Sequence, residues 1–311
     1  MTYPRSHLID PEGGTYHVCS RCVRRAFLFG IDRRTGKDFS HRQAWIENRI
    51  LELSDIFTVS VYAYAVMSNH YHIVLRLESV QLSDEEVADR WLKLCPGRKV
   101  YSNVEEVQAM RRSTLLGDET RLEELRSRLG SLSWFMRFIN EPLARLANKE
   151  DCCKGRFWEG RFNSQALLDE ASVLACMVYV DLNPVRAKMA KDLEDSEFTS
   201  IQRRIKTQDL QEPVGAINQP GSSKAPFPPT ALDDYIDLIR WTAVRQSYMR
   251  TGIQLDVGSC LKKNHTNMAN WFSYHLPLVD TWQRAMGSSE ALSEYARSIG
   301  QFWIRRRSVP T

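Results

Sequence analysis

The sequence predicts an α+β fold, in which an antiparallel sheet in the first two thirds of the chain is combined with helices. The clearest sign of the sheet is the stretch 61–77, where two runs rich in Val, Ile, Tyr and Leu flank Met-Ser-Asn. Such residues suit a half-buried pleated surface, so this stretch is typical of two strands joined by a tight corner. Before and after it, apolar residues recur at the three- and four-residue spacing of helices.

The composition is that of an ordinary globular protein. The 311 residues are 43% hydrophobic and 26% charged, which is enough for one large domain or two modest ones. No apolar run reaches the length of a membrane span, and residues 1–11 lack an apolar signal region. We therefore expect a cytoplasmic protein with reduced cysteines and no membrane partner. The net charge of +4 permits nucleic-acid binding without requiring it.

The first elements follow in the order strand, helix, strand, strand. A strand region is expected within 13–29, where Tyr16 and Val18 alternate with polar residues. Ser40 and Gln43 form a possible capping box, and helical spacing then continues to Leu53. The strand pair 61–77 comes next. This order is the start of a ferredoxin-like or related split βαβ sheet.

A highly charged helical block, about 79–130, follows the strand pair. Ser83 and Glu86 form a capping box for a helix from 84 to about 94, and 104–116 and 118–129 also have helical spacing. We interpret this block as a solvated helical insertion; a lid or a DNA-contacting arm is the alternative. An amphipathic helix is expected over 132–147, with a kink or break at Pro142.

The C-terminal third divides into a linker and a helical region. Residues 205–230 are rich in Pro, Gly, Ser and Gln, which indicates a linker. Residues 231–311 return to helical spacing, and Ser288 or Ser289 could cap a last helix over 291–304. Large aromatic residues usually bury, so we expect those of this region to belong to the core. They are Trp271, Phe272, Trp282, Phe302 and Trp303.

A pair of histidines opens the second strand of the pair. Because side chains alternate along a strand, His70 and His72 project from one face and Tyr71 from the other. Two neighbouring imidazoles can chelate one divalent metal through neutral ring nitrogens. The alternative is that both are hydrogen-bonded structural residues.

The cysteines suggest a second, weaker metal hypothesis. Cys19 and Cys22 form a CxxC pair, but a structural zinc site usually needs a second pair of ligands. Cys152 and Cys153 are the candidate partners. A zinc-binding structural module is therefore an alternative to the histidine site.

Two later segments carry further candidates. In 154–162, glycines, arginines and aromatics are interleaved, which suits a loop that grips phosphates and stacks on bases; packing of its aromatics in the core is the alternative. In 170–190, Tyr179 and Asn183 are four residues apart and share one face of an expected helix; taken alone, they would be a core tyrosine and a helix-ending asparagine. Pro184 is expected to end or kink that helix and to push Asn183 out of the α region.

Three ordered motifs together resemble the single-tyrosine HUH transposases. They are the His-hydrophobic-His strand YAVMSNHYHIVL at 64–75, the segment GRFWEGRF at 155–162 and the tyrosine helix YVDLNPVRA at 179–187. The REP-associated tyrosine transposases are the most similar branch. The resemblance covers about 13–201, and the sequence has Ser-Asn-His where the family usually has Pro-Asn-His.

The resemblance implies a fold, a reaction and a set of site residues. The fold would be a ferredoxin-like or RRM-like antiparallel sheet with helices on one face, within a catalytic domain at 1–204. The activity would be cleavage and strand transfer of single-stranded DNA. Tyr179 would be the nucleophile that forms a 5′-phosphotyrosine intermediate, and His70, His72 and Asn183 would hold Mg²⁺ or Mn²⁺.

The resemblance also implies single-stranded DNA hairpins, such as repetitive extragenic palindromes, as the partner. The expected DNA contacts are basic residues for phosphates and aromatic residues for bases: Arg156, Phe157, Trp158, Arg161 and Arg186. Arg24 and Arg25 are weaker candidates. Both a monomer and a homodimer are compatible with the family. A catalytically silent hairpin-binding regulator is the alternative function.

Overall fold

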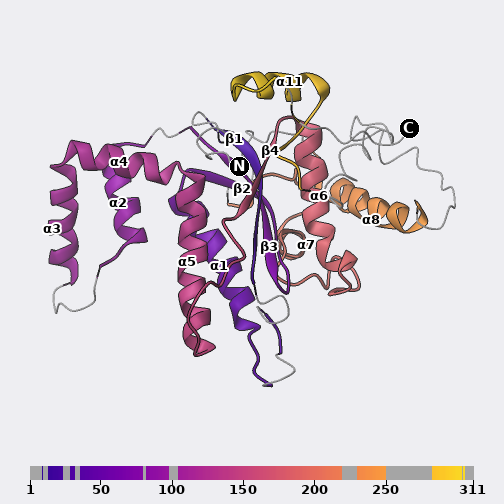
Figure 1. Cartoon of the computed structure of the whole chain (residues 1–311), viewed down its shortest axis with the longest axis horizontal. Helices are drawn as coiled ribbons and strands as arrows, with labels where there is room; N and C mark the ends of the chain where they lie inside the picture. The colour runs from indigo at the N-terminus through magenta and orange to yellow at the C-terminus, as the bar shows by residue number, and fades with distance from the viewer. Residues whose placement is uncertain are drawn as a thin grey trace.

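A five-stranded mixed sheet lies at the centre of the computed structural model, in the order β2-β3-β1-β4-β5 (Figure 1). Its strands are β1 (Gly14–Arg21), β2 (Val59–Val66), β3 (His70–Leu77), β4 (Asn163–Leu167) and β5 (Ala285–Met286). The first four pair antiparallel, as expected, whereas β5 runs parallel to β4. The structure describes residues 9, 13–23, 29–31, 36–79, 82–97, 104–218, 230–249, 282–302 and 304.

The helices agree with the expected segments in the first half of the chain. They are α1 (His41–Ile56), α2 (Asp84–Leu94), α3 (Val104–Leu116), α4 (Glu119–Leu129), α5 (Leu132–Glu150), α6 (Glu170–Arg186), α7 (Ser200–Thr207), α8 (Leu232–Met249) and α11 (Ser289–Ser298). The capping boxes differ: Ser83 and Glu86 form one, but the Ser40 side chain makes no cap hydrogen bond. Ser288 caps α11.

The prolines do not end their helices. Helix α5 continues past Pro142 to Glu150, and α6 continues past Pro184 to Arg186. Proline removes one backbone donor and crowds the preceding turn. The expectation that Pro184 pushes Asn183 out of the helix is therefore wrong. Both helices bury an apolar face against the sheet, which stabilises the helical path through the proline.

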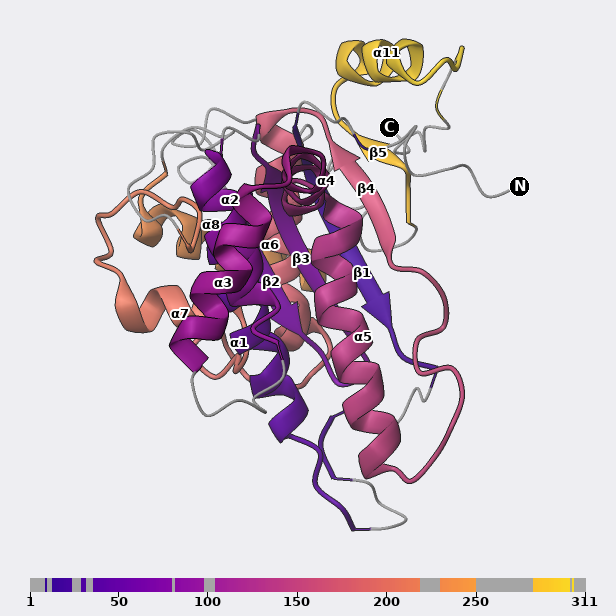
Figure 2. The ribbon, with the colours of Figure 1, turned by 90° about the vertical axis from the view of Figure 1, so that its left-hand side faces the viewer.

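Helices cover both faces of the sheet, so the expectation of helices on one face is wrong. Helices α1 and α5 pack on one face, and α6, α7 and α8 pack on the other (Figures 1 and 2). As a consequence, all eight residues of β2 are buried. A bulge between Val61 and Ala63 shifts the register, so that Val61 and Tyr64 join the α1–α5 core while Tyr62 and Ala63 join the α6 core.

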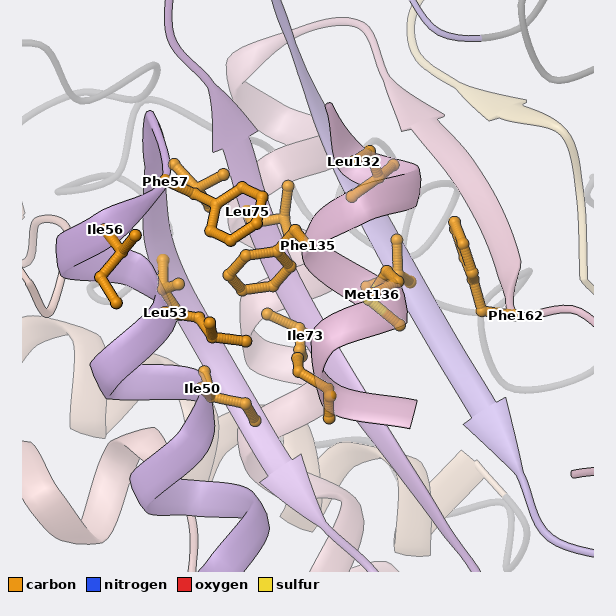
Figure 3. Packing of buried hydrophobic residues seen from close by; sticks show 14 of the residues in the cluster. Ile50, Leu53, Ile56, Phe57, Ile73, Leu75, Leu132, Phe135, Met136 and Phe162 are labelled. Carbon is orange, nitrogen blue, oxygen red and sulfur yellow. The ribbon is translucent and has the colours of Figure 1, made fainter. Parts of the chain in front are cut away.

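The core beneath α1 and α5 extends into the helical insertion. Phe57 and Phe135 meet edge to face, with ring centroids 5.6 Å apart (Figure 3). Helix α4 adds Leu122, Leu125 and Leu129 to this cluster. Helix α3 buries none of its residues. The insertion is therefore half core and half solvated surface, with α3 as its exposed part.

The C-terminal third is also built into the α6 side of the molecule. In the stretch expected to be a linker, Val214 and Ala216 are buried, and the Ile217 N–H donates to the Val61 carbonyl at 2.7 Å. Helix α8 packs on α6, and β5 extends the sheet beyond β4. Residues 205–218 and 230–244 thus share a core with the preceding domain, while 219–229 lie outside the described residues. The division at 204 and 230 stays a prediction.

Several other expectations lie outside the described part of the chain. They concern Arg24, Arg25, Trp271, Phe272 and Trp303. The other two C-terminal aromatics expected in the core, Trp282 and Phe302, are exposed, so that expectation is wrong for them. Within the described residues, none of the helices has the length and apolar character needed to span a membrane.

A buried carboxylate connects α6 to α7 and α8. One oxygen of Asp181 accepts hydrogen bonds from the Ser200 hydroxyl and, at 3.1 Å, from the Ile201 N–H. The other oxygen accepts from the Tyr235 hydroxyl at 2.7 Å. Burial raises the pKa of Asp181, and the nearby Arg204 guanidinium opposes that rise. A fully buried carboxylate with these partners fixes the position of α6 relative to its neighbours.

Replacement of Asp181 by Ala should lower the free energy of unfolding by about 3 kcal/mol or more. The change would leave the buried Arg204 charge without its neighbouring carboxylate, and the Tyr235 hydroxyl and the Ile201 N–H without their acceptor. Asp237→Ala, on the exposed side of α8, is the matched control and should stay within about 0.5 kcal/mol. Urea denaturation measures both. A loss below about 1 kcal/mol for Asp181→Ala would contradict this account.

Candidate functional site

The two histidines of β3 face α6, and the tyrosine between them faces the opposite core. His70, His72 and Val74 alternate with Tyr71 and Ile73 along the strand, and Val74 belongs to the α6 core. The Tyr71 hydroxyl donates to Asn140 Oδ1 on α5 at 2.8 Å. The predicted alternation is therefore confirmed. Tyr71 is also fully buried on the far side of the sheet from the histidines.

Helix α6 places Tyr179 directly against these histidines. The Tyr179 ring meets His72 edge to face, with ring centroids 5.7 Å apart, and lies 5.9 Å from the ring of His17 on β1. The Arg186 guanidinium carbon lies 5.3 Å from the centroid of the Tyr179 ring. Residues 179, 183 and 186 follow the spacing of one helix face, so Asn183 lies on the same stripe. Segments more than 100 residues apart in the chain thus form one site.

The histidines are held in the neutral form by burial. Burial lowers the pKa of His70 to about 4 and that of His72 well below its usual value, and the Arg21 cation lowers both further. Burial raises the pKa of Tyr179, whereas the Arg186 charge and hydrogen bonding with Asn183 oppose that rise. The site therefore combines neutral imidazoles with a protonated phenol beside a cation.

Several features of the histidine pair fit a metal site. The rings of His70 and His72 have centroids 4.8 Å apart. His70 Nδ1–H donates to Asn69 Oδ1 at 2.5 Å, which leaves Nε2 as the nitrogen with a free electron pair. His72 Nε2 is buried and has no hydrogen-bond partner among the described residues. The two imidazoles thus fit as ligands for a divalent ion.

Among the described residues, no three or more His, Cys, Asp or Glu side chains are grouped to hold a metal ion. Asn183 carries a neutral amide oxygen on the adjacent helix face, and it is the candidate for a third protein ligand. Cys19 and Cys22 do not offer a competing zinc site, because their side chains lie on opposite faces of the sheet. Cys22 packs in the α1–α5 core, whereas Cys19 pairs with His72 across the strands and faces the α6 side.

The segment 154–162 is a loop whose aromatics anchor it to the protein. Phe157 is only 2% exposed and packs in the core, so its side chain is not available to stack on a base. The Trp158 indole is half-buried, and its Nε1–H donates to the Asn140 carbonyl at 2.9 Å. The expected stacking role of Phe157 is therefore wrong, and the core alternative holds for it. Backbone hydrogen bonds hold the loop against the end of β1, and this position brings its aromatic side chains onto the protein core.

The arginines of the same loop point to solvent. Arg156 and Arg161 are exposed on either side of the buried Phe157 and half-buried Trp158. The backbone is fixed there by two hydrogen bonds, from the Val23 N–H to the Phe157 carbonyl at 3.0 Å and from the Glu159 N–H to the Arg21 carbonyl at 2.9 Å. Two cations are thus presented on a fixed backbone.

Sequence reasoning missed three residues of the site. His17 on β1 and Gln165 on β4 face each other in register and are both buried on the α6 side. Trp282, just before β5, packs on His17 with ring centroids 4.7 Å apart. His17 stands among the polar residues that alternate with Tyr16 and Val18, so the sequence carried no signal that its side chain is buried in a site. Nothing in the sequence indicated that Trp282 would reach it.

Comparison with known proteins gives a weak result. Among solved structures, the chain is similar to one described as the REP-associated tyrosine transposase bound to a REP hairpin, with 15% identity and a TM-score of 0.41. The similarity covers 74% of this chain and 100% of that chain. No family model matches, and no curated protein matches. Similarity at this level establishes neither a family nor a function for this chain.

Acid should destabilise the protein through the buried histidines. An unfolded histidine has a pKa of 6.5, whereas His17 and His70 have native pKa values of about 4. Between these values the unfolded state binds more protons, so the free energy of unfolding falls as the pH is lowered. Each histidine should cost about 2 kcal/mol between pH 7 and pH 5. Urea denaturation at both pH values measures the loss, and equal stability would contradict it.

Proposed function

We propose that this chain is a tyrosine-dependent, metal-dependent nuclease and strand transferase that acts on single-stranded DNA hairpins. The observation that supports this most is the position of Tyr179 against His72, with ring centroids 5.7 Å apart. A phenol beside neutral imidazoles and a guanidinium has the groups that phosphodiester cleavage by a tyrosine requires. His72 Nε2 is buried without a hydrogen-bond partner among the described residues, which leaves its electron pair available to a ligand.

Each side chain of the site has a role in this reaction. The Tyr179 phenol gives up its proton, its oxygen attacks the phosphorus, a 5′-phosphotyrosine bond forms, and the bond to the 3′ oxygen breaks. That oxygen takes up one proton, which balances the one lost by the phenol, and leaves as a 3′-hydroxyl. Arg186 stabilises the phenolate, since its cation already opposes the burial that raises the pKa of Tyr179. His70, His72 and Asn183 would hold Mg²⁺ or Mn²⁺, which supplies Lewis-acid neutralisation of the scissile phosphate.

The basic loop is proposed as the phosphate grip. Arg156 and Arg161 are exposed cations on an anchored backbone, which is the arrangement that positions a nucleic-acid strand without reading its sequence. Trp158 keeps part of its surface exposed and remains a candidate for stacking. A single-stranded DNA hairpin is the proposed substrate, and this part of the proposal rests on the resemblance of the three motifs.

Tyr179→Phe should abolish the covalent protein–DNA adduct. The variant lacks the attacking oxygen but keeps the ring that packs on His72. The assay uses single-stranded hairpin oligonucleotides with Mn²⁺ or Mg²⁺, and a denaturing gel reports the adduct. Tyr71→Phe is the matched control and should still form the adduct, because that hydroxyl lies on the opposite face and donates to Asn140. Adduct formation by Tyr179→Phe would show that the nucleophile is another residue.

The double variant Arg156→Ala, Arg161→Ala should bind hairpin DNA more weakly than the wild type, and the loss of affinity should be largest at low salt. Each lost phosphate contact should reduce the slope of log affinity against log salt by about 1. Arg137→Ala, an exposed arginine on α5 paired with Glu141, is the control and should leave the slope unchanged. Fluorescence anisotropy at several salt concentrations measures the slopes. An unchanged slope in the double variant would remove the loop from the DNA-binding surface.

A further inference from the structure

Three buried side chains form a hydrogen-bonded row across three neighbouring strands. Gln165 Oε1 on β4 lies 3.4 Å from His17 Nδ1 on β1, and His17 Nε2 lies 2.9 Å from His72 Nδ1 on β3. Gln165, His17 and His72 are 2%, 1% and 4% exposed, so water does not compete for these bonds. The row ends at His72 Nε2, which is buried and without a partner among the described residues.

When the Gln165 side-chain oxygen faces His17, only one placement of the ring protons on His17 and His72 satisfies both hydrogen bonds. An amide oxygen is an acceptor only, so His17 Nδ1 must carry the proton. His17 Nε2 then has a lone pair and accepts from His72 Nδ1–H. His72 Nε2 is left with its own lone pair. The reverse arrangement would set a lone pair against the Gln165 oxygen and bury an N–H at His72 Nε2 with no acceptor.

We propose that His17, held by Gln165, is a positioning residue that fixes His72 in the tautomer protonated at Nδ1. This keeps the Nε2 electron pair directed out of the row, where it can bind a cation. The inference deepens the proposed function and rests on it for the identity of that cation. It concerns two residues outside the three motifs that carry the transposase resemblance.

The packing around the row supports a positioning role. His17 and His72 lie with ring centroids 5.0 Å apart and planes 26° apart, and Trp282 covers the His17 ring. Gln165 is opposite His17 in the register of β1 and β4. The backbone pairing of three strands therefore sets the spacing of the row. A ligand nitrogen held in this way keeps its direction before any ion binds.

The first test is the tautomer of His72 in the metal-free protein. Two-bond ¹H–¹⁵N correlation spectra distinguish a proton on Nδ1 from one on Nε2. The wild type should show Nδ1–H at His72, and both His17→Phe and Gln165→Leu should lose this preference. Gln165→Glu keeps an acceptor and should retain it. Thr15→Val, a buried polar position on the same face of β1, is the control and should also retain it. A proton on Nε2 in the wild type would overturn the proposal.

The second test is the affinity for Mn²⁺, measured by titration calorimetry on the same variants. His17→Phe should bind about 10- to 100-fold more weakly than the wild type, with circular dichroism showing a retained fold. Unchanged affinity would overturn the role of His17. If the wild type binds no Mn²⁺, the metal part of the proposed function fails. The tautomer spectra still decide whether His17 positions His72, so the two failures are distinguishable.

Discussion

Helix α6 packs across the central strands, and its rotation about its own axis decides whether a site exists at all. Asp181 and Tyr179 are two residues apart, which separates their side chains by about 200° around the helix. The bonds of Asp181 to Ser200, Ile201 and Tyr235 therefore turn Tyr179 toward the histidines. The same contact that holds α7 and α8 in place sets the geometry of the candidate nucleophile.

The two-residue period of β-strands made part of this site predictable. Alternation alone placed His70 and His72 on one face and Tyr71 on the other, and helical spacing placed Tyr179 and Asn183 on one stripe. Capping chemistry placed the start of α2 at Asp84. These features are local, since each depends only on residues within a few positions of one another. The meeting of the tyrosine and the histidines was reached through a family resemblance, because spacing carries no information about contacts across 100 residues.

The features that sequence reasoning missed are long-range. Strand β2 is buried on both sides because helices pack on both faces of the sheet, and its bulge sets which side chains enter which core. Neither feature follows from residues close together in the sequence. Phe157 looked equally suited to a base or to the core, and its burial was decided by the fit of the loop against β1. His17 and Gln165 acquire meaning only through strand pairing. The C-terminal residues 282–286 join the site from more than 100 residues away, for the same reason.

The proposed reaction requires that the phenolic oxygen of Tyr179 forms a covalent bond to a DNA phosphate. Trapping the intermediate on a hairpin oligonucleotide, digesting it with protease and identifying the modified peptide by mass spectrometry tests this directly. The account predicts a nucleotide attached through a phosphodiester to the peptide that contains Tyr179. Attachment at another residue, or hairpin binding with no attachment on any substrate, would contradict it.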